Sequence, residues 1–185
     1  LKLFDVPFRR LLVPLLPFLT CATAISEEVD GRTLVYLDLR PASRSAVLLG
    51  KYLAAMLVTG SILCGSVVLL HVGAYVTDPS GIFEEWEILA RGLAVGALGG
   101  AYYGALTLLS GALLVEVPYL LSLLFFVVFD LFLGWLPGVV RLASVGYHLA
   151  NLLGTAERVV LVFETPEVSM WLSAAVIGIL TAGFV

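Results

Sequence analysis

The stretch from Tyr52 to Val76 contains no Asp, Glu, Lys or Arg and is almost entirely apolar. A helix needs about 20 such residues to cross the hydrocarbon core of a bilayer. Helices on the surface of a soluble domain keep one polar face, and this stretch has none. The mean hydropathy of +1.07 and the 13% of charged residues agree with a membrane protein, because soluble domains carry about 25% charged residues.

Four other apolar stretches approach the length of a span. We expect spans at about residues 6–25, 52–76, 88–115, 117–136 and 169–185. In the first of them, Pro14 and Pro17 would kink the helix, while Arg9 and Arg10 would extend towards the membrane interface. The chain starts at a leucine and its last apolar run stops abruptly, so we expect a fragment with a sixth span before residue 1. The predicted fold is all-α, a polytopic bundle of membrane helices in a single domain.

Charge and cysteine usage exclude several classes of protein. The net charge of −4 is small and spread along the chain, which argues against nucleic-acid binding. Cys21 and Cys64 both lie inside apolar runs, where they are typical of small buried residues and not of a disulfide framework. We expect no metal site in this chain.

The connections between spans predict an orientation. The segment 26–51 holds the densest basic cluster of any connection, which places it in the cytoplasm by the positive-inside rule. Residues 77–87 and 137–168 then lie outside, and the turn at Glu116 lies inside. Lys2, Arg9 and Arg10 fall on the outer side in this topology and do not fit the rule. The basic residues of the cytoplasmic segment are Arg32, Arg40, Arg44 and Lys51.

The outer connection at 137–168 has a helical pattern. Between Arg141 and Phe163, apolar and polar residues form two stripes at alternating spacings of three and four. This pattern predicts a helix or a helical hairpin at the outer membrane interface. It could be a lid that packs over its own bundle, or it could present His148 and Asn151 to a substrate.

Four glycines repeat at every fourth residue, at Gly92, Gly96, Gly100 and Gly104. Small residues at this spacing let membrane helices approach closely. We expect them to pack against another helix of the same subunit, with a seam between two subunits as the alternative.

Two ionisable residues lie in or near the apolar stretches, where they are costly unless paired or hydrated. Glu116 sits at a turn before Pro118 and is expected to be interfacial. Asp130 lies within a span, where it could line a pathway or bind a structural partner.

The charged segment 26–51 has one catalytic interpretation. Glu27, Glu28 and Arg32 spell E-E-x-x-x-R, which resembles part of the signature of CAAX-type intramembrane proteases. Those enzymes also need F-x-x-x-H and H-x-x-x-N motifs. His71 follows Val67 instead of a Phe, and the asparagine after His148 comes three residues later, not four.

A second interpretation accounts for more of the segment. An acidic pair, Gly, Thr-Leu, Pro-x-Ser-Arg and Leu-Gly-Lys follow one another between two spans. In this order the segment resembles the region after the second span in permeases of the ABC type-2 exporter family. The matching residues are Glu27, Glu28, Gly31, Thr33, Leu34, Leu37, Arg40, Pro41, Ser43, Arg44, Leu49, Gly50 and Lys51.

In that family the segment is a coupling helix, which seats in a groove of a separate ATPase. Local signals agree with a short helix from about Ser26 to Leu39, with acids in its first turn. Pro41 would end it and Ser43 could cap the next helix. The apolar anchors would be Leu34, Tyr36 and Leu37. A merely solvated loop is the alternative.

The resemblance implies a transmembrane subunit of an ATP-driven exporter that works as a homo- or heterodimer in the cell membrane. Gly50–Lys51 lacks the upstream glycine of a P-loop, so a partner ATPase would bind ATP and Mg²⁺. The alternatives are the protease-like enzyme and a non-transporting membrane scaffold. Apolar span walls would suit lipids, peptides, drugs or polysaccharide carriers equally.

Overall fold

The computed structural model describes residues 5–21, 44–76, 81–114, 117–136, 138–155 and 168–184. Within these ranges every regular element is helical and no residue forms a strand, which confirms the all-α prediction for this part of the chain. The elements, with η marking π- and 3-10 helices, are η1 (Asp5–Leu12), α2 (Val13–Cys21), α5 (Arg44–Ala74), α6 (Gly81–Glu84), α7 (Trp86–Leu113), α8 (Pro118–Phe125), η2 (Phe126–Phe132), α9 (Leu133–Trp135), η3 (Gly138–Ala143), α10 (Val145–Leu153) and α11 (Met170–Phe184).

Two helices are long and apolar enough to cross a membrane by themselves, over Ser45–Ala74 and Trp86–Leu113. Shorter apolar helices cover Leu120–Phe132 and Met170–Phe184. The helices therefore lie where spans were predicted, and the number of crossings stays a prediction. The first expected span, at about 6–25, is π-helical over η1 and α-helical over α2, with Pro17 inside the α-helical part.

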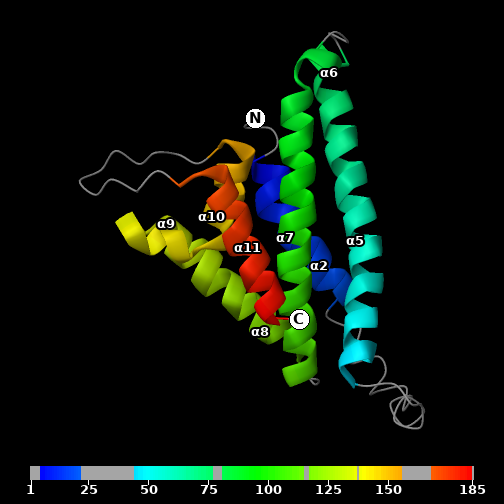
Figure 1. Cartoon of the computed structure of the whole chain (residues 1–185), viewed down its shortest axis with the longest axis vertical. Coiled ribbons are helices and arrows are strands. Elements are labelled where there is room, and N and C mark those ends of the chain that lie inside the picture. Colours follow the sequence, from blue (N-terminus) through cyan, green and yellow to red (C-terminus); the bar gives the residue numbers. More distant parts are fainter. Residues whose placement is uncertain are drawn as a thin grey trace.

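Helix α7 is the centre of the bundle. Figure 1 shows it between α5 on one side and α8, α10 and α11 on the other. It packs against all four of these helices and against α2. Its middle is rich in Gly and Ala, and such small residues allow several helices to approach one backbone at once.

Helix α5 has a different position, at the edge of the bundle (Figure 1). Its buried residues form one narrow seam, while side chains elsewhere on the helix, such as Leu57 at 74% and Leu69 at 75% exposure, face outward. In a membrane those side chains would meet lipid. The buried seam consists of Tyr52, Thr59, Leu63, Val67 and His71.

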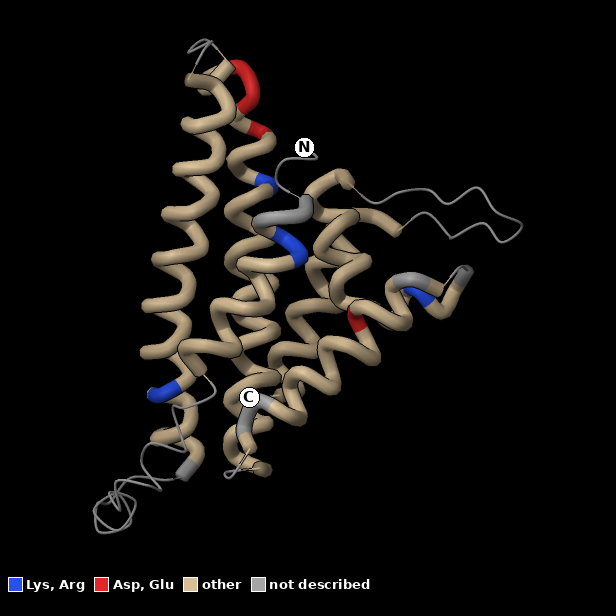
Figure 2. Tube along the Cα trace, turned by 180° about the vertical axis from the view of Figure 1, so that it is seen from behind, with Lys and Arg blue, Asp and Glu red and all other residues tan. Residues whose placement is uncertain are grey.

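Helix α5 is also longer than a bilayer requires. Its 31 residues extend about 46 Å at 1.5 Å per residue, against a hydrocarbon core of about 30 Å. The helix begins at Arg44, about two turns before the span predicted at Tyr52, and directly after the Pro41–Ser43 stop-and-cap signal. The part from Arg44 to Lys51 thus extends beyond the apolar stretch. Figure 2 shows acidic positions gathered near the other end of α5, where α6 joins α7.

The predicted outer helical connection is broken into pieces. The stretch from Arg141 starts in the 3-10 helix η3, which ends at Ala143. Ser144 then caps α10, because its hydroxyl accepts a hydrogen bond from the Tyr147 N–H. Gly154 ends α10 in the left-handed conformation with φ 78°, which favours glycine. Of the two predicted arrangements, the single helix from residue 141 onward is therefore wrong. The helical hairpin stays a prediction, because residues 156–163 lie outside the described ranges.

Helix α10 does not lie on the bundle as a surface helix. Its buried residues include Val145, His148, Leu149 and Leu153. It packs against α7, α11, η1 and η2. With nine residues it is about 14 Å long, too short to cross a membrane. It is an internal helix, enclosed by these four elements.

Candidate functional site

Most of the predicted coupling residues lie outside the described ranges. These are Glu27, Glu28, Gly31, Thr33, Leu34, Tyr36, Leu37, Arg40, Pro41 and Ser43. Arg44 and Lys51 lie in the first two turns of α5. The structure therefore shows how the segment is anchored, by the end of α2 at Cys21 and the start of α5 at Arg44.

A hydrogen bond joins the two anchoring helices. The Thr20 hydroxyl donates to the Leu16 carbonyl at 3.0 Å. It therefore accepts from the Thr59 hydroxyl, whose oxygen lies 2.6 Å away. Thr59 is fully buried, and Cys21 lies next to this pair. The hydrogen bond ties α2 to the middle of α5 within the apolar part of the bundle.

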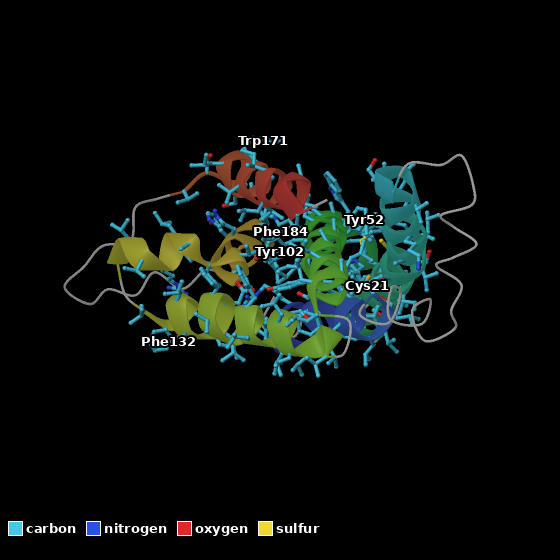
Figure 3. All side chains as sticks on the ribbon, turned by 90° about the horizontal axis from the view of Figure 1, so that it is seen from below. Cys21, Tyr52, Tyr102, Phe132, Trp171 and Phe184 are labelled. Atoms are coloured by element: carbon cyan, nitrogen blue, oxygen red, sulfur yellow. The ribbon has the colours of Figure 1, made fainter. Side chains whose placement is uncertain are left out.

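Both anchoring helices also rest on α7. The Tyr52 hydroxyl of α5 donates to the Ala101 carbonyl of α7 at 3.0 Å. Figure 3 shows Cys21 and Tyr52 between α5 and α7, whereas Tyr102 and Phe184 lie on the side of α7 away from α5. The rings of Tyr102 and Phe184 are 5.8 Å apart between centroids, and they pack α11 onto α7. Helix α7 is thus held from both sides.

The glycines of α7 face neighbours from the same chain. A Cβ added at Gly96 would lie 3.2 Å from Phe8 Cζ and 3.7 Å from Leu63 Cβ, and one at Gly100 would lie 2.8 Å from Leu63 Cδ1. A Cβ at Gly104 would meet Met56 and Cys21. Gly92 is also buried. These glycines create the close contact of α7 with η1, α2 and α5.

Asp130 accepts hydrogen bonds from α7 and from the start of α10. The Tyr103 hydroxyl of α7 donates to its Oδ2 at 2.7 Å. The Gly146 N–H of α10 and the Ser144 hydroxyl donate to its Oδ1 at 2.9 and 3.3 Å. The carboxyl thus caps the amino-terminal end of α10, where the helix dipole favours negative charge. The Arg9 guanidinium of η1 donates to the Gly146 carbonyl in the same turn, at 2.9 Å. The expectation that Arg9 extends towards the membrane interface did not include this contact inside the bundle.

His148 and Asn151 face α11 and not an open path. His148 is 3% exposed, with Nδ1 3.1 Å from the Ser173 hydroxyl and Nε2 2.9 Å from the Leu142 carbonyl. Asn151 donates to the Val168 carbonyl at 2.8 Å and to the Ser173 hydroxyl at 2.9 Å. These two residues join α10 to the first turns of α11.

The described residues show no group of three His, Cys, Asp or Glu that could hold a metal ion. His71, the other histidine, lies far from His148 in the chain, with Nε2 3.2 Å from the Ile82 carbonyl. Glu27, Glu28 and Glu116 are outside the described ranges. Nothing in this geometry supports the protease-like alternative.

A comparison with protein families decides the class of the molecule. A family model described as an ABC-2 family transporter protein matches residues 7–182. The chain belongs to the ABC-2 transporter family. Searches of curated proteins and of solved structures found no significant match.

The match confirms the resemblance seen in the charged segment and extends it to nearly the whole chain. As an ABC-2 family protein the chain is a transmembrane transporter subunit, a permease of the ABC class. The apolar helices and the family match together indicate that the chain is a membrane protein. The family gives no support to the protease or scaffold alternatives.

Several site residues of this ABC-2 protein were not found by sequence reasoning. Gly99 falls between the four glycines of the repeat and faces α2 and α10. Tyr103, Ser144 and Ser173 are common residues in apolar surroundings, and only the fold brings them to Asp130 and His148. Ser144 alone carried a local signal, because a serine is among the residues preferred directly before the first residue of a helix, at the N-cap.

Proposed function

We propose that this ABC-2 protein is the transmembrane subunit of an exporter, and that a separate ATPase drives it through the segment 26–51. The single observation that carries the proposal is the family match over residues 7–182. It includes the whole segment and the helices at both of its ends. Proteins of this family usually work with an ATPase subunit. That partner would bind ATP and Mg²⁺.

The anchoring of the segment supports this role. Helix α5 runs without a break from Arg44 to Ala74, so a displacement imposed on its first turn would reach the far end of the bundle. The Thr20–Thr59 hydrogen bond would pass part of the same displacement to α2. A partner that grips the segment would therefore move two helices together against α7.

The proposed arrangement has five spans in this chain, in the cell membrane. The segment 26–51 faces the cytoplasm, and the connection 137–168, with α10 packed inside the bundle, joins its two spans on the outer side. Two such subunits, identical or related, would form the path. In this arrangement Asp130, His148 and Asn151 hold α10 in place, and any contact they make with substrate would require α10 to move.

Cysteine labelling would test the orientation. With Cys21 and Cys64 replaced, a cysteine at Ser43 should react with an impermeant maleimide only in inside-out vesicles. A cysteine at Ser80 or at Thr155 should react in right-side-out cells, because the two loops lie on the opposite side. The reagent cannot cross the bilayer, so the side of reaction gives the side of the residue. Reversed labelling would place the segment away from any cytoplasmic ATPase.

Substitutions in the segment would test the coupling. Buried apolar anchors dominate small interfaces and are worth about 2 kcal/mol or more each, roughly 30-fold in affinity. We therefore expect Tyr36→Ala and Leu37→Asp to abolish copurification of the ATPase and substrate-stimulated ATP hydrolysis in nanodiscs. Arg44→Gln should reduce assembly at low salt and have a smaller effect at high salt, because salt screens exposed charges.

The matched control is Ser66→Ala. Ser66 lies on an exposed part of α5 and its hydroxyl donates to the Ile62 carbonyl of its own helix at 2.7 Å. This variant should bind the ATPase as the parent does. If the segment variants keep both the ATPase and transport at parental levels, the segment is not the coupling element.

A further inference from the structure

The contacts of His148 fit a neutral imidazole. The Leu142 carbonyl can only accept a hydrogen bond, so His148 Nε2, 2.9 Å from it, carries a proton. The Ser173 hydroxyl oxygen accepts from the Asn151 amide at 2.9 Å. The Ser173 proton is then free to point at His148 Nδ1, 3.1 Å away. A neutral imidazole satisfies every one of these groups.

The result is a hydrogen-bond chain with one direction. It runs from the Asn151 amide to the Ser173 hydroxyl, from there to His148 Nδ1, and from His148 Nε2 to the Leu142 carbonyl. Ser173 is fully buried and His148 is 3% exposed, so water cannot easily replace a lost partner. We call this chain the His148 latch, since it joins α10 to α11 and η3.

We propose that the His148 latch is acid-sensitive, and that a proton taken up by Nδ1 releases α10 from α11. Protonation would turn Nδ1 from an acceptor into a donor. The Ser173 hydroxyl would lose the acceptor for its own proton, and a charge would appear in a buried site. Burying a charge without a partner of opposite sign is strongly unfavourable.

Among the residues that the structure describes, the charged groups beside α10 do not supply such a partner. Arg9 of η1 binds the Gly146 carbonyl, and Arg141 of η3 lies over the Tyr147 ring at 5.1 Å. On α7, Arg91 lies beside Gly154 and pairs with Glu87 at 2.6 Å. Three of the charges that face α10 are therefore positive.

The described acid closest to α10 is already in use. Asp130 of η2 accepts from Tyr103, Ser144 and Gly146. The other titratable groups of α7 are Tyr102 and Tyr103, and neither α9 nor α11 contains an ionisable residue over its helical range. In agreement, burial lowers the pKa of His148, and the hydrogen bond to the Leu142 carbonyl opposes this shift only in part.

The sign of the pH effect follows from this direction. A histidine whose pKa is lowered in the folded state favours the neutral form, so the latch is fully stable above the ordinary histidine pKa of about 6.5. Its contribution is lost as the pH falls below that value. On the topology proposed above, on which this point alone rests, the latch would sense the outer compartment.

Nitrogen NMR of the protein in nanodiscs would test the protonation state directly. With ¹⁵N-labelled histidine, the His148 signals are those that persist in His71→Gln and vanish in His148→Gln. At pH 7.5 we expect an unprotonated Nδ1 and a protonated Nε2, and at pH 4.5 both nitrogens protonated. The opposite tautomer at pH 7.5, or no protonation by pH 4.5, would overturn the proposal.

A distance measurement would test the release. Spin labels at Thr155→Cys and Ala175→Cys, with Cys21 and Cys64 replaced, report the separation of α10 and α11. We expect a longer distance at pH 4.5 than at 7.5, a pH-independent short distance in His148→Gln, and a long distance at both pH values in Ser173→Ala. Gln can accept and donate as neutral His does. An unchanged distance while NMR shows His148 protonated, or a pH shift that persists in His148→Gln, would refute the latch.

Discussion

Asp130→Ala should lower the stability of the bundle more than any other single polar substitution among the described residues. It leaves the Tyr103 hydroxyl, the Ser144 hydroxyl and the Gly146 N–H without their acceptor. Each buried donor left unpaired costs about 1–3 kcal/mol, so we expect a loss of roughly 3 kcal/mol or more. Thermal unfolding in nanodiscs should show a Tm lower by about 6–12 °C.

Asp130→Asn is the matched comparison for this substitution. Its amide oxygen can still accept from Gly146 and Ser144, and its NH₂ group can donate to the Tyr103 oxygen once that hydroxyl rotates. We expect Asp130→Asn to lose about a third of the stability that Asp130→Ala loses. If Asn is as damaging as Ala, the negative charge at the start of α10 matters more than the hydrogen bonds. If Ala changes nothing, the network does not hold α10.

Gly99→Ala should be the most damaging of the single-methyl additions on α7. The new Cβ would meet Val13 Cγ1 and would lie 3.1 and 3.2 Å from the two terminal carbons of Leu149. Val13 and Leu149 are both almost completely buried, and a β-branched valine in a helix has little rotamer freedom. Overpacking of this kind costs about 1–3 kcal/mol, measured again as a lower Tm.

Glycines in open surroundings provide the control. At Gly60 and Gly65 of α5 no atom lies within 4 Å of an added Cβ. Alanine there should be neutral or should stabilise the helix by up to about 1 kcal/mol. The loss of stability in Gly104→Ala should lie between those at Gly99 and at Gly60, because the Met56 side chain that the new Cβ meets is flexible. Equal effects at Gly99 and Gly60 would show that helix propensity and not packing decides the outcome.

The apolar runs were sufficient to predict the positions of the helices. A helix needs about 20 apolar residues to span a bilayer, and this requirement does not depend on tertiary contacts. The start of α5 at Arg44 was similarly readable, since Pro41 and Ser43 are local signals. The broken outer connection was harder to predict. Apolar residues can keep helical spacing across a break in the helix. The spacing that starts at Arg141 therefore did not reveal that one helix ends before Ser144 and the next ends at Gly154.

The partners of the polar residues could not be predicted at all. Asp130 binds Tyr103 at a separation of 27 residues and Gly146 at 16. His148 meets Ser173 at 25. No periodic pattern links such positions, because the contacts depend on how whole helices pack. The sequence indicates that Asp130 needs a hydrogen-bonding partner in its apolar surroundings. Only the packing of the helices identifies Tyr103 and Gly146 as its partners.

The narrow seam of α5 gives the two sides of the bundle unequal freedom to move. Helix α7 could not tilt without disturbing contacts with α2, α5, α8, α10 and α11 at once. Helix α5 shares one line of buried side chains with the rest, and on that line Tyr52 and Thr59 form hydrogen bonds to α7 and α2. Because the outward side chains of α5 would meet lipid in a membrane, a displacement of this helix would be resisted mainly along the seam where it packs against α7 and α2. A force applied at Arg44 would therefore act on a long helix whose buried side chains lie on one face.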